Sequence, residues 1–302
     1  MMPRVVGLGE ILWDILPDGA RHLGGAPMNV AVHAQALGCE AAVISAVGDD
    51  ELGRAAIERL TRQHRLDVTA VAILAGRPTG AVDVRLAEGQ PTYEFRPDVA
   101  WDFLQATPAA RKTAQAADAV VFGTLAQRDA ASRITIGELL ATTRAECLRV
   151  FDVNLRPPFY SEAILRESLA RTNVLKLNDE ELPIVLSAIG IGTKGDWALQ
   201  LFAEMPDLRV VALTRGAQGS TVFTRDRPEG HTLLARQVAV KDTVGAGDAF
   251  TAVLVEGLLQ GSSLEAIHRQ AVATAAFVCS QAGATPALPA SLVEAITHEK
   301  NT

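Results

Sequence analysis

The chain has 302 residues, of which 48% are hydrophobic, so it is long enough to bury a substantial core in one large domain. Acidic residues outnumber basic ones by 35 to 28, and the net charge of −7 without an evident basic face argues against nucleic acid as a partner. We see no signal peptide, membrane span or CxxC pair, and we therefore expect a cytoplasmic protein without a membrane partner, a disulfide framework or a zinc site.

Short β-rich runs alternate with longer helical ones along the chain. The expected strands cover residues 5–8, 41–47, 119–122, 150–153, 174–177 and 210–214. The expected helices cover residues 29–37, 52–62, 130–141, 162–170, 180–187 and 197–203. This alternation predicts an α/β fold with a doubly wound, mostly parallel sheet and helices on both faces. The ligand crevice should then lie beyond the carboxyl ends of the strands.

Two segments interrupt this pattern. Residues 10–23 and 79–96 alternate apolar and polar side chains, and the second contains a turn at residues 88–91. The period of two predicts strands outside the main sheet. They form either a small β lid over the site or two surface hairpins. We expect a lid that belongs to a single domain spanning residues 1–302.

Polar residues follow the first strand, where the crevice should open. Glu10 and Asp14 are carboxylates, and Asp14 either accepts hydrogen bonds from vicinal hydroxyls or is a solvated loop acid. Gly24 and Gly25 allow a ligand to approach the backbone closely. Asn29 lies near the start of a helix, where its amide either binds a sugar hydroxyl or caps the helix.

Two later strands also end in polar residues. Asp152, Asn154 and Arg156 follow one strand, and Arg156 is suited to a phosphate or a sugar. Asn178 and Glu181 follow the next, three residues apart at the start of a helix. That spacing places an amide and a carboxylate on one face, where they either hold water around Mg²⁺ or form a capping box.

A glycine-containing turn follows the strand at 210–214. Thr214, Gly216 and Gly219 are candidates for contact with the phosphates or the ribose of a nucleotide. The alternative is an ordinary hairpin turn into residues 221–223.

The most informative feature of the chain is the segment 242–250, with the sequence DTVGAGDAF. Gly245, Ala246 and Gly247 leave backbone N–H groups free at the start of a helix, where the helix dipole favours an anion. Asp248 places a carboxylate in the same field. The arrangement suits phosphoryl transfer, because amides cradle the transferred group beside a base for the acceptor hydroxyl.

Taken together, these motifs resemble those of the ribokinase-like (PfkB) carbohydrate kinases, most closely the fructokinases, over essentially the whole chain. DTVGAGDAF is similar to the C-terminal signature of that family, and GGAPMNVAVHAQALG to its N-terminal signature. Other segments are similar to fructokinase blocks in the same order: GEILWD, YEFRPDVAWD, FDVNLRPPFY, KLNDEE and SQAGATPALP.

The resemblance implies a role for each matching residue. It implies that Asp248 is the catalytic base and that Gly245, Ala246 and Gly247 form the anion hole. The residues expected to bind the sugar are Asp14, Gly24, Gly25, Asn29, Phe95, Arg96, Asn154 and Arg156. Those expected to bind ATP are Asn178, Thr214, Gly216, Gly219, Gly245 and Gly247. Glu181 is linked to Mg²⁺, and a monovalent cation such as K⁺ is implied at Asp242, Val244 and Gly283.

We therefore expect an ATP:sugar phosphotransferase that transfers the γ-phosphate to the 6-hydroxyl of fructose and forms a homodimer through the lid. A 2-keto-3-deoxygluconate kinase is an alternative, with Tyr93, Phe95 and Arg96 holding the carboxylate of the sugar acid. A nucleoside kinase, a non-catalytic sugar-binding protein and an NAD(P) oxidoreductase are also compatible with parts of the pattern.

Overall fold

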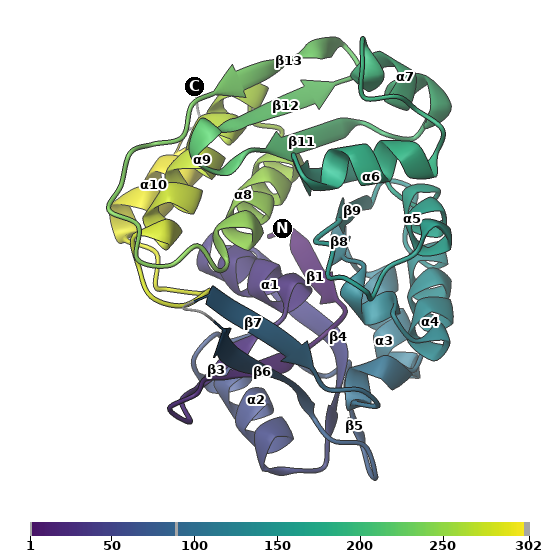
Figure 1. Ribbon diagram of the computed structural model, residues 1–302, viewed down its shortest axis with the longest axis vertical. Helices are drawn as coiled ribbons and strands as arrows, with labels where there is room; N and C mark the ends of the chain where they lie inside the picture. Colours follow the sequence, from purple (N-terminus) through teal and green to yellow (C-terminus); the bar gives the residue numbers. More distant parts are fainter. Residues whose placement is uncertain (1, 88–89, 299–302) are drawn as a thin grey trace.

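The computed structural model describes residues 2–87 and 90–298, which form a large sheet, a small second sheet and helices around them (Figure 1). The strands of the large sheet are β1 (Arg4–Leu8), β4 (Glu40–Gly48), β5 (Val71–Leu74), β8 (Ala119–Phe122), β9 (Leu148–Asp152), β10 (Val174–Asn178), β11 (Val210–Thr214), β12 (Ser220–Thr224) and β13 (Arg227–Leu233). Their order is β13-β12-β11-β10-β9-β8-β1-β4-β5. In this order, all neighbouring strands pair in parallel except at one end, where β12 is antiparallel to both β11 and β13.

The topology explains where a ligand site is expected. The inner strands are short, buried apolar runs, as in AVVF of β8, which is typical of a parallel sheet covered on both faces. The chain passes from β1 to β4 and β5 on one side and then to β8 on the other side of β1. The carboxyl ends of β1 and its neighbours therefore lie at a topological switch point, where α/β sheets bind ligands.

Helices cover both faces of the large sheet, as predicted. One layer holds α1 (Ala26–Ala36), α8 (Ala246–Gln260), α9 (Leu264–Cys279) and α10 (Ala290–His298). The other holds α3 (Pro108–Gln115), α4 (Ala130–Ala141), α5 (Glu162–Leu169), α6 (Glu181–Ala188) and α7 (Trp197–Glu204). Figure 1 shows α8, α9 and α10 on the opposite side of the sheet from α4 and α5. Each layer buries its own apolar cluster, the first around Val30 and Phe250 and the second around Leu139 and Leu165.

The small sheet contains β2 (Leu12–Ile15), β3 (Arg21–Gly24), β6 (Gly80–Ala87) and β7 (Gln90–Phe95) in the order β3-β2-β6-β7. It confirms the prediction of strands outside the main sheet, and it joins both segments in one sheet because β2 pairs with β6. Trp13 and Leu23 pack with Leu60 of α2 (Glu51–Arg62). The turn expected at 88–91 begins with Glu88 and Gly89, which lie outside the described residues.

Some elements differ from the prediction. The helix expected from Asn29 begins three residues earlier, because Gly25 is the N-cap and Pro27 occupies the first turn. The sequence patterns did not predict β5, β13, α3, α9 and α10. The strands β5 and β13 are half-exposed edge strands of the sheet, and β13 is largely polar, so their apolar signal is weak. None of the helices within residues 2–87 and 90–298 has the length and apolar character needed to cross a bilayer.

Candidate active site

Asp248 lies in the first turn of α8, which begins with Gly245 as N-cap. Its side chain is only 9% exposed, and its Oδ2 accepts a hydrogen bond of 2.8 Å from Asn29 Nδ2. Burial raises the pKa of Asp248 to about 6, and the nearby Asp152 carboxylate adds to the rise. A carboxylate with a pKa close to neutrality suits general base catalysis.

The N-terminus of α8 requires glycine at its first position. Gly245 has a φ of 80°, and a Cβ there would lie 2.2 Å from the Ala284 carbonyl oxygen. The same carbonyl lies 3.0 Å from His33 Nε2, so that α1 and α8 both contact this loop. The close contact keeps the N–H groups at the start of α8 free of side chains that would block an anion.

Two buried acceptors without partners in the described part of the chain lie near the start of α1, one on Glu10 from the loop after β1 and one on Asn29 of α1. Glu10 Oε1 accepts the N–H of Ala26, so that Glu10 rather than Asn29 satisfies the helix end. Among the described residues, Glu10 Oε2 and Asn29 Oδ1 are buried and have no hydrogen-bond partner. Burial raises the pKa of Glu10 to about 7. Buried acceptors without partners are uncommon, and hydroxyl donors of a bound ligand would satisfy them.

Asp14 reaches this region from the small sheet. It lies on β2, and a Cβ added at Gly24 of the adjacent β3 would lie 3.3 Å from its Oδ2. Burial raises the pKa of Asp14, whereas the charges of His22 and Arg156 oppose the rise. At Gly25 a Cβ would lie 2.3 Å from the Glu10 carbonyl oxygen, so the backbone passes there without a side chain.

Arg156 is a cation that faces several of these acids. Its side chain is exposed, and its charge lowers the pKa of Glu10, Asp14 and Asp248 against the effect of burial. Asn154, two residues earlier, has a φ of 42°, a left-handed conformation that Asn tolerates better than most residues. Of these two residues, Arg156 is the one whose charge acts on the carboxylates.

Phe95 and Arg96 are engaged within and beside the small sheet. Arg96 forms a bidentate pair with Asp83 at 2.8 and 2.7 Å, and Phe95 contacts the edge of the Phe159 ring at a centroid distance of 5.5 Å. The Asp83 pair occupies the guanidinium of Arg96. Of the two arginines considered for the substrate, Arg156 is the one whose charge lowers the pKa of Asp248.

Asn178 and Glu181 form the reciprocal bonds of a helix start. Asn178 Oδ1 accepts the N–H of Glu181, and Glu181 Oε2 accepts the N–H of Asn178, each at 2.8 Å. Glu181 Oε1 also accepts the N–H of Leu155 at 2.8 Å, which ties α6 to the chain after β9. Glu181 is buried, and burial raises its pKa while the charge of Lys176 opposes the rise. The helix-start interpretation is thus correct, and each carboxylate oxygen keeps a second lone pair for a hydrated cation.

The candidates for nucleotide contact lie at the end of β11. Thr214 pairs with Asn178 of β10, which places the two polar strand ends side by side. Gly216 and Gly219 both have positive φ, and a Cβ at Gly219 would lie 2.0 Å from the Leu233 carbonyl oxygen. The turn also joins the antiparallel strands β11 and β12, so it is a hairpin turn as well as a candidate nucleotide loop.

The residues expected at a monovalent cation lie together. Asp242 Oδ1 accepts the N–H of Val244 at 3.0 Å, and its Oδ2 accepts the N–H of Gly283 at 3.1 Å. Asp242 therefore joins the turn before α8 to the loop that contacts Gly245. Within residues 2–87 and 90–298, no group of three or more His, Cys, Asp and Glu side chains could hold a metal ion on its own.

Three polar residues lie beneath the site, of which Asp152 was among the polar strand-end candidates and Lys176 and Thr251 were not predicted. Lys176 Nζ donates to Asp152 Oδ1 at 2.9 Å, and Thr251 Oγ1 donates to Asp152 Oδ2 at 2.9 Å. All three are buried. A signal for Lys176 exists in the sequence, because a lysine between two leucines of a buried strand needs a partner.

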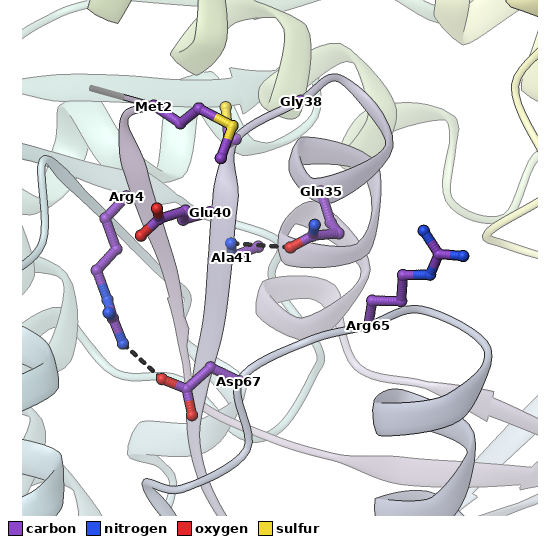
Figure 2. Close-up of a pocket in the computed structure, with 9 residues that line it drawn as sticks. Met2, Arg4, Gln35, Gly38, Glu40, Ala41, Arg65 and Asp67 are labelled. Atoms are coloured by element: carbon purple, nitrogen blue, oxygen red, sulfur yellow. Dashed lines mark hydrogen bonds and ion pairs between the residues drawn. The ribbon is translucent and has the colours of Figure 1, made fainter.

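A hollow of about 350 Å³ lies at the other edge of the sheet, where β1 and β4 begin (Figure 2). It is lined by Arg4, Gln35, Glu40, Arg65 and Asp67 among others. Figure 2 shows two bonded pairs in it, Arg4 with Asp67 and Gln35 with the N–H of Ala41. It contains none of the predicted site residues, so we place the candidate site at the carboxyl edge instead.

Comparison with known proteins gives a consistent result. The family model for the pfkB family carbohydrate kinases matches residues 16–291. A fructokinase of Klebsiella pneumoniae is 33% identical over 270 residues, which cover 85% of each chain. A 5-dehydro-2-deoxygluconokinase of Bacillus cereus is 26% identical over 281 residues, covering 89% of this chain and 83% of its own.

A solved structure agrees with this relationship. The fructokinase of Vibrio cholerae O395, crystallised with fructose, ADP and a calcium ion, superposes with a TM-score of 0.80 at 27% identity. The match covers 98% of this chain and 99% of that one. It confirms the predicted ribokinase-like fold over essentially the whole length.

Proposed function

The chain belongs to the pfkB family of carbohydrate kinases and is an ATP-dependent sugar phosphotransferase, and we propose that it phosphorylates the 6-hydroxyl of fructose with Asp248 as general base. The observation that carries the proposal is the position of Asp248, buried in the first turn of α8 and bonded to Asn29. The fructokinases among its relatives support fructose as the acceptor.

In this mechanism the sugar lies between α1 and the small sheet. Its hydroxyls donate to Asp14, to Asn29 Oδ1 and to Glu10 Oε2, which satisfies the two buried acceptors. Asp248 takes the proton of the 6-hydroxyl as that oxygen attacks the γ-phosphorus of ATP. The N–H groups at Gly245–Gly247 stabilise the charge that develops on the transferred group, and each such donor contributes about 3–4 kcal/mol.

The remaining residues suit the phosphates and the cations. Thr214 lies beside Asn178, and Gly216 and Gly219 lie in the turn that follows; all three would contact the nucleotide. Hydrated Mg²⁺ fits beside Asn178 and Glu181, because within the described residues the buried carboxylates of Glu181, Asp152 and Asp248 face a single buried cation, Lys176. When bound there, Mg²⁺ would neutralise phosphate charge. K⁺ fits at Asp242, Val244 and Gly283, which Asp242 already holds together.

We also propose that the small sheet is a lid within a single domain of residues 1–302. It carries Asp14 and Gly24, and it packs on α2 through Trp13 and Leu23. Closure over the sugar would exclude water and limit the hydrolysis of ATP. A homodimer through the outer face of this sheet remains a prediction, and sedimentation of the pure protein tests it.

ADP release measured with a panel of acceptors tests the choice of sugar. The panel contains fructose, ribose, 2-keto-3-deoxygluconate, 5-dehydro-2-deoxygluconate and adenosine, each with and without K⁺. We expect the highest kcat/KM with fructose. A higher value for any other acceptor would contradict the proposal for fructose and leave the kinase assignment intact.

A keto-deoxy sugar acid is the second candidate, and the exposed guanidinium of Arg156 favours it. A carboxylate substrate would pair with Arg156, whereas fructose has no charge to offer. Arg156→Gln separates the two, because it should raise the KM of a sugar acid about tenfold or more and the KM of fructose much less.

A further inference from the structure

Lys176 occupies an unusual position for a lysine. It lies in the centre of β10, is only 8% exposed, and has leucine on either side in the strand. Its Nζ donates to Asp152 Oδ1 at 2.9 Å. Burial alone would lower the pKa of Lys176, but the charges of Asp152 and Glu181 outweigh it and raise the pKa. The side chain is therefore a buried ammonium that is paired with a carboxylate.

The ammonium lies directly against the start of α8. A Cβ added at Gly247 would lie 2.9 Å from Lys176 Nζ. The charge of Lys176 also acts on Asp248 and Glu181, so one cation faces three buried carboxylates when Asp152 is included. The ammonium thus lies beside the N–H groups that we assign to the phosphoryl group.

A purely structural role explains this arrangement poorly. Replacing a buried ion pair with apolar residues of similar volume is often neutral or stabilising, so stability alone gives no reason for the pair. An ammonium has three hydrogens. Within residues 2–87 and 90–298 we find one acceptor for them, Asp152 Oδ1. Two hydrogens are left for a ligand that approaches Gly247.

We propose that Lys176 is a further catalytic residue, whose ammonium contacts the non-bridging oxygens of the transferred phosphoryl group at Gly247. Asp152 holds the ammonium in place, and Thr251 fixes Asp152 from α8. Charge spreads over these oxygens in the transition state, and a fixed cation in a buried site stabilises it without reorganisation. The proposal rests on phosphoryl transfer at Gly245–Asp248.

Three variants test the proposal: Lys176→Met, the double variant Asp152→Asn/Lys176→Met, and Lys112→Met. The last removes an exposed lysine of α3 as a matched control. The acceptor is whichever sugar the wild type phosphorylates best, so a failure of fructose leaves this test intact. We measure kcat, the KM of the sugar, and the affinity for ADP with and without aluminium fluoride, a mimic of the transferred phosphoryl group.

We expect Lys176→Met to lower kcat about 10²–10³-fold, to leave the KM of the sugar nearly unchanged, and to abolish the gain in affinity that aluminium fluoride gives to ADP. The double variant should be as slow, because neutralising Asp152 does not restore the cation. Lys112→Met should match the wild type.

Two results would overturn the proposal. Recovery of kcat in the double variant would mean that Lys176 only balances the charge of Asp152. Tight binding of ADP with aluminium fluoride by Lys176→Met would remove the contact with the phosphoryl group. If Lys176→Met alone fails to fold, the double variant, which also neutralises the carboxylate bonded to Lys176, decides between these outcomes.

Discussion

Asn29 and Asp248 are 219 residues apart in the chain, and the Asn29 amide donates to the Asp248 carboxylate at 2.8 Å. The contact joins the first turn of α1 to the first turn of α8. Because Nδ2 is used in this bond, Oδ1 is left as a buried acceptor without a partner among the described residues. One side chain thus positions the proposed base and faces the proposed sugar site.

Asn29→Ala should change the pH dependence of the enzyme as well as the affinity for sugar. The hydrogen bond from Asn29 lowers the pKa of Asp248, so its loss should move the acidic limb of the kcat/KM profile to higher pH. The KM of the sugar should rise about tenfold, because a hydrogen bond of about 1–1.5 kcal/mol is lost. A pH–rate profile together with KM measurements checks both effects.

Gln35→Ala is the matched control for this variant. It removes an amide from the same helix, and that amide bonds to the N–H of Ala41 and not to the site. Its profile should keep the acidic limb of the wild type. If Asn29→Ala also kept the acidic limb of the wild type, the hydrogen bond from Asn29 would not control the pKa of Asp248.

Asp248→Asn should be more stable than the wild type at alkaline pH. Burial raises the pKa of Asp248 from 3.8 to about 6, so the folded state binds the proton more tightly than the unfolded state. The stability that this group contributes is present below pH 4 and is lost as the pH rises through 6. That loss is about 3 kcal/mol, and the neutral amide avoids it.

Urea unfolding at pH 8 and pH 4 checks this expectation. The free energy of unfolding of Asp248→Asn should exceed that of the wild type at pH 8 and equal it at pH 4. Burial and the charge of Asp248 both raise the pKa of Glu10, so the neutral amide also relieves Glu10 and should add to the difference at pH 8. A wild type that is as stable as the variant at pH 8 would mean that Asp248 is not held in a desolvated state.

Gly245→Ala and Gly247→Ala should differ sharply. At Gly245 the φ of 80° and the Ala284 carbonyl oxygen at 2.2 Å exclude a Cβ, so we expect a loss of at least ~2 kcal/mol of stability and no turnover. At Gly247 the Cβ meets only the end of the Lys176 side chain and no backbone atom, so the fold should persist with reduced turnover. Thermal unfolding and kcat distinguish them, and similar melting temperatures would contradict this account of the loop.

The sequence was sufficient for the parts of the fold and site with strong local signals. Buried strands such as 119–122 and the helix 130–141 have the predicted bounds, because their apolar runs and helix periodicity are local properties. The helix after Gly245 was equally clear, since glycines precede a long apolar run. Edge strands such as β13 were missed because they bury little.

Pairings across the chain were the part that the sequence could not provide. Asn29 fits a helix cap by its residue type, and only the fold shows that Gly25 is the N-cap and that Asn29 bonds to Asp248. Likewise, Arg96 has the right charge for a substrate, but Asp83 of the neighbouring strand β6 pairs with it. Such partners are set by register and packing, which local patterns do not specify.

The turnover of Asp248→Asn tests the central claim most directly, because the variant keeps the shape of the side chain and an oxygen acceptor for Asn29. With saturating ATP and sugar, kcat should fall about 10²–10⁴-fold, the contribution of a general base, while calorimetry should show sugar binding close to that of the wild type. A folded Asp248→Asn that turns over at the wild-type rate would contradict the assignment of Asp248 as the base.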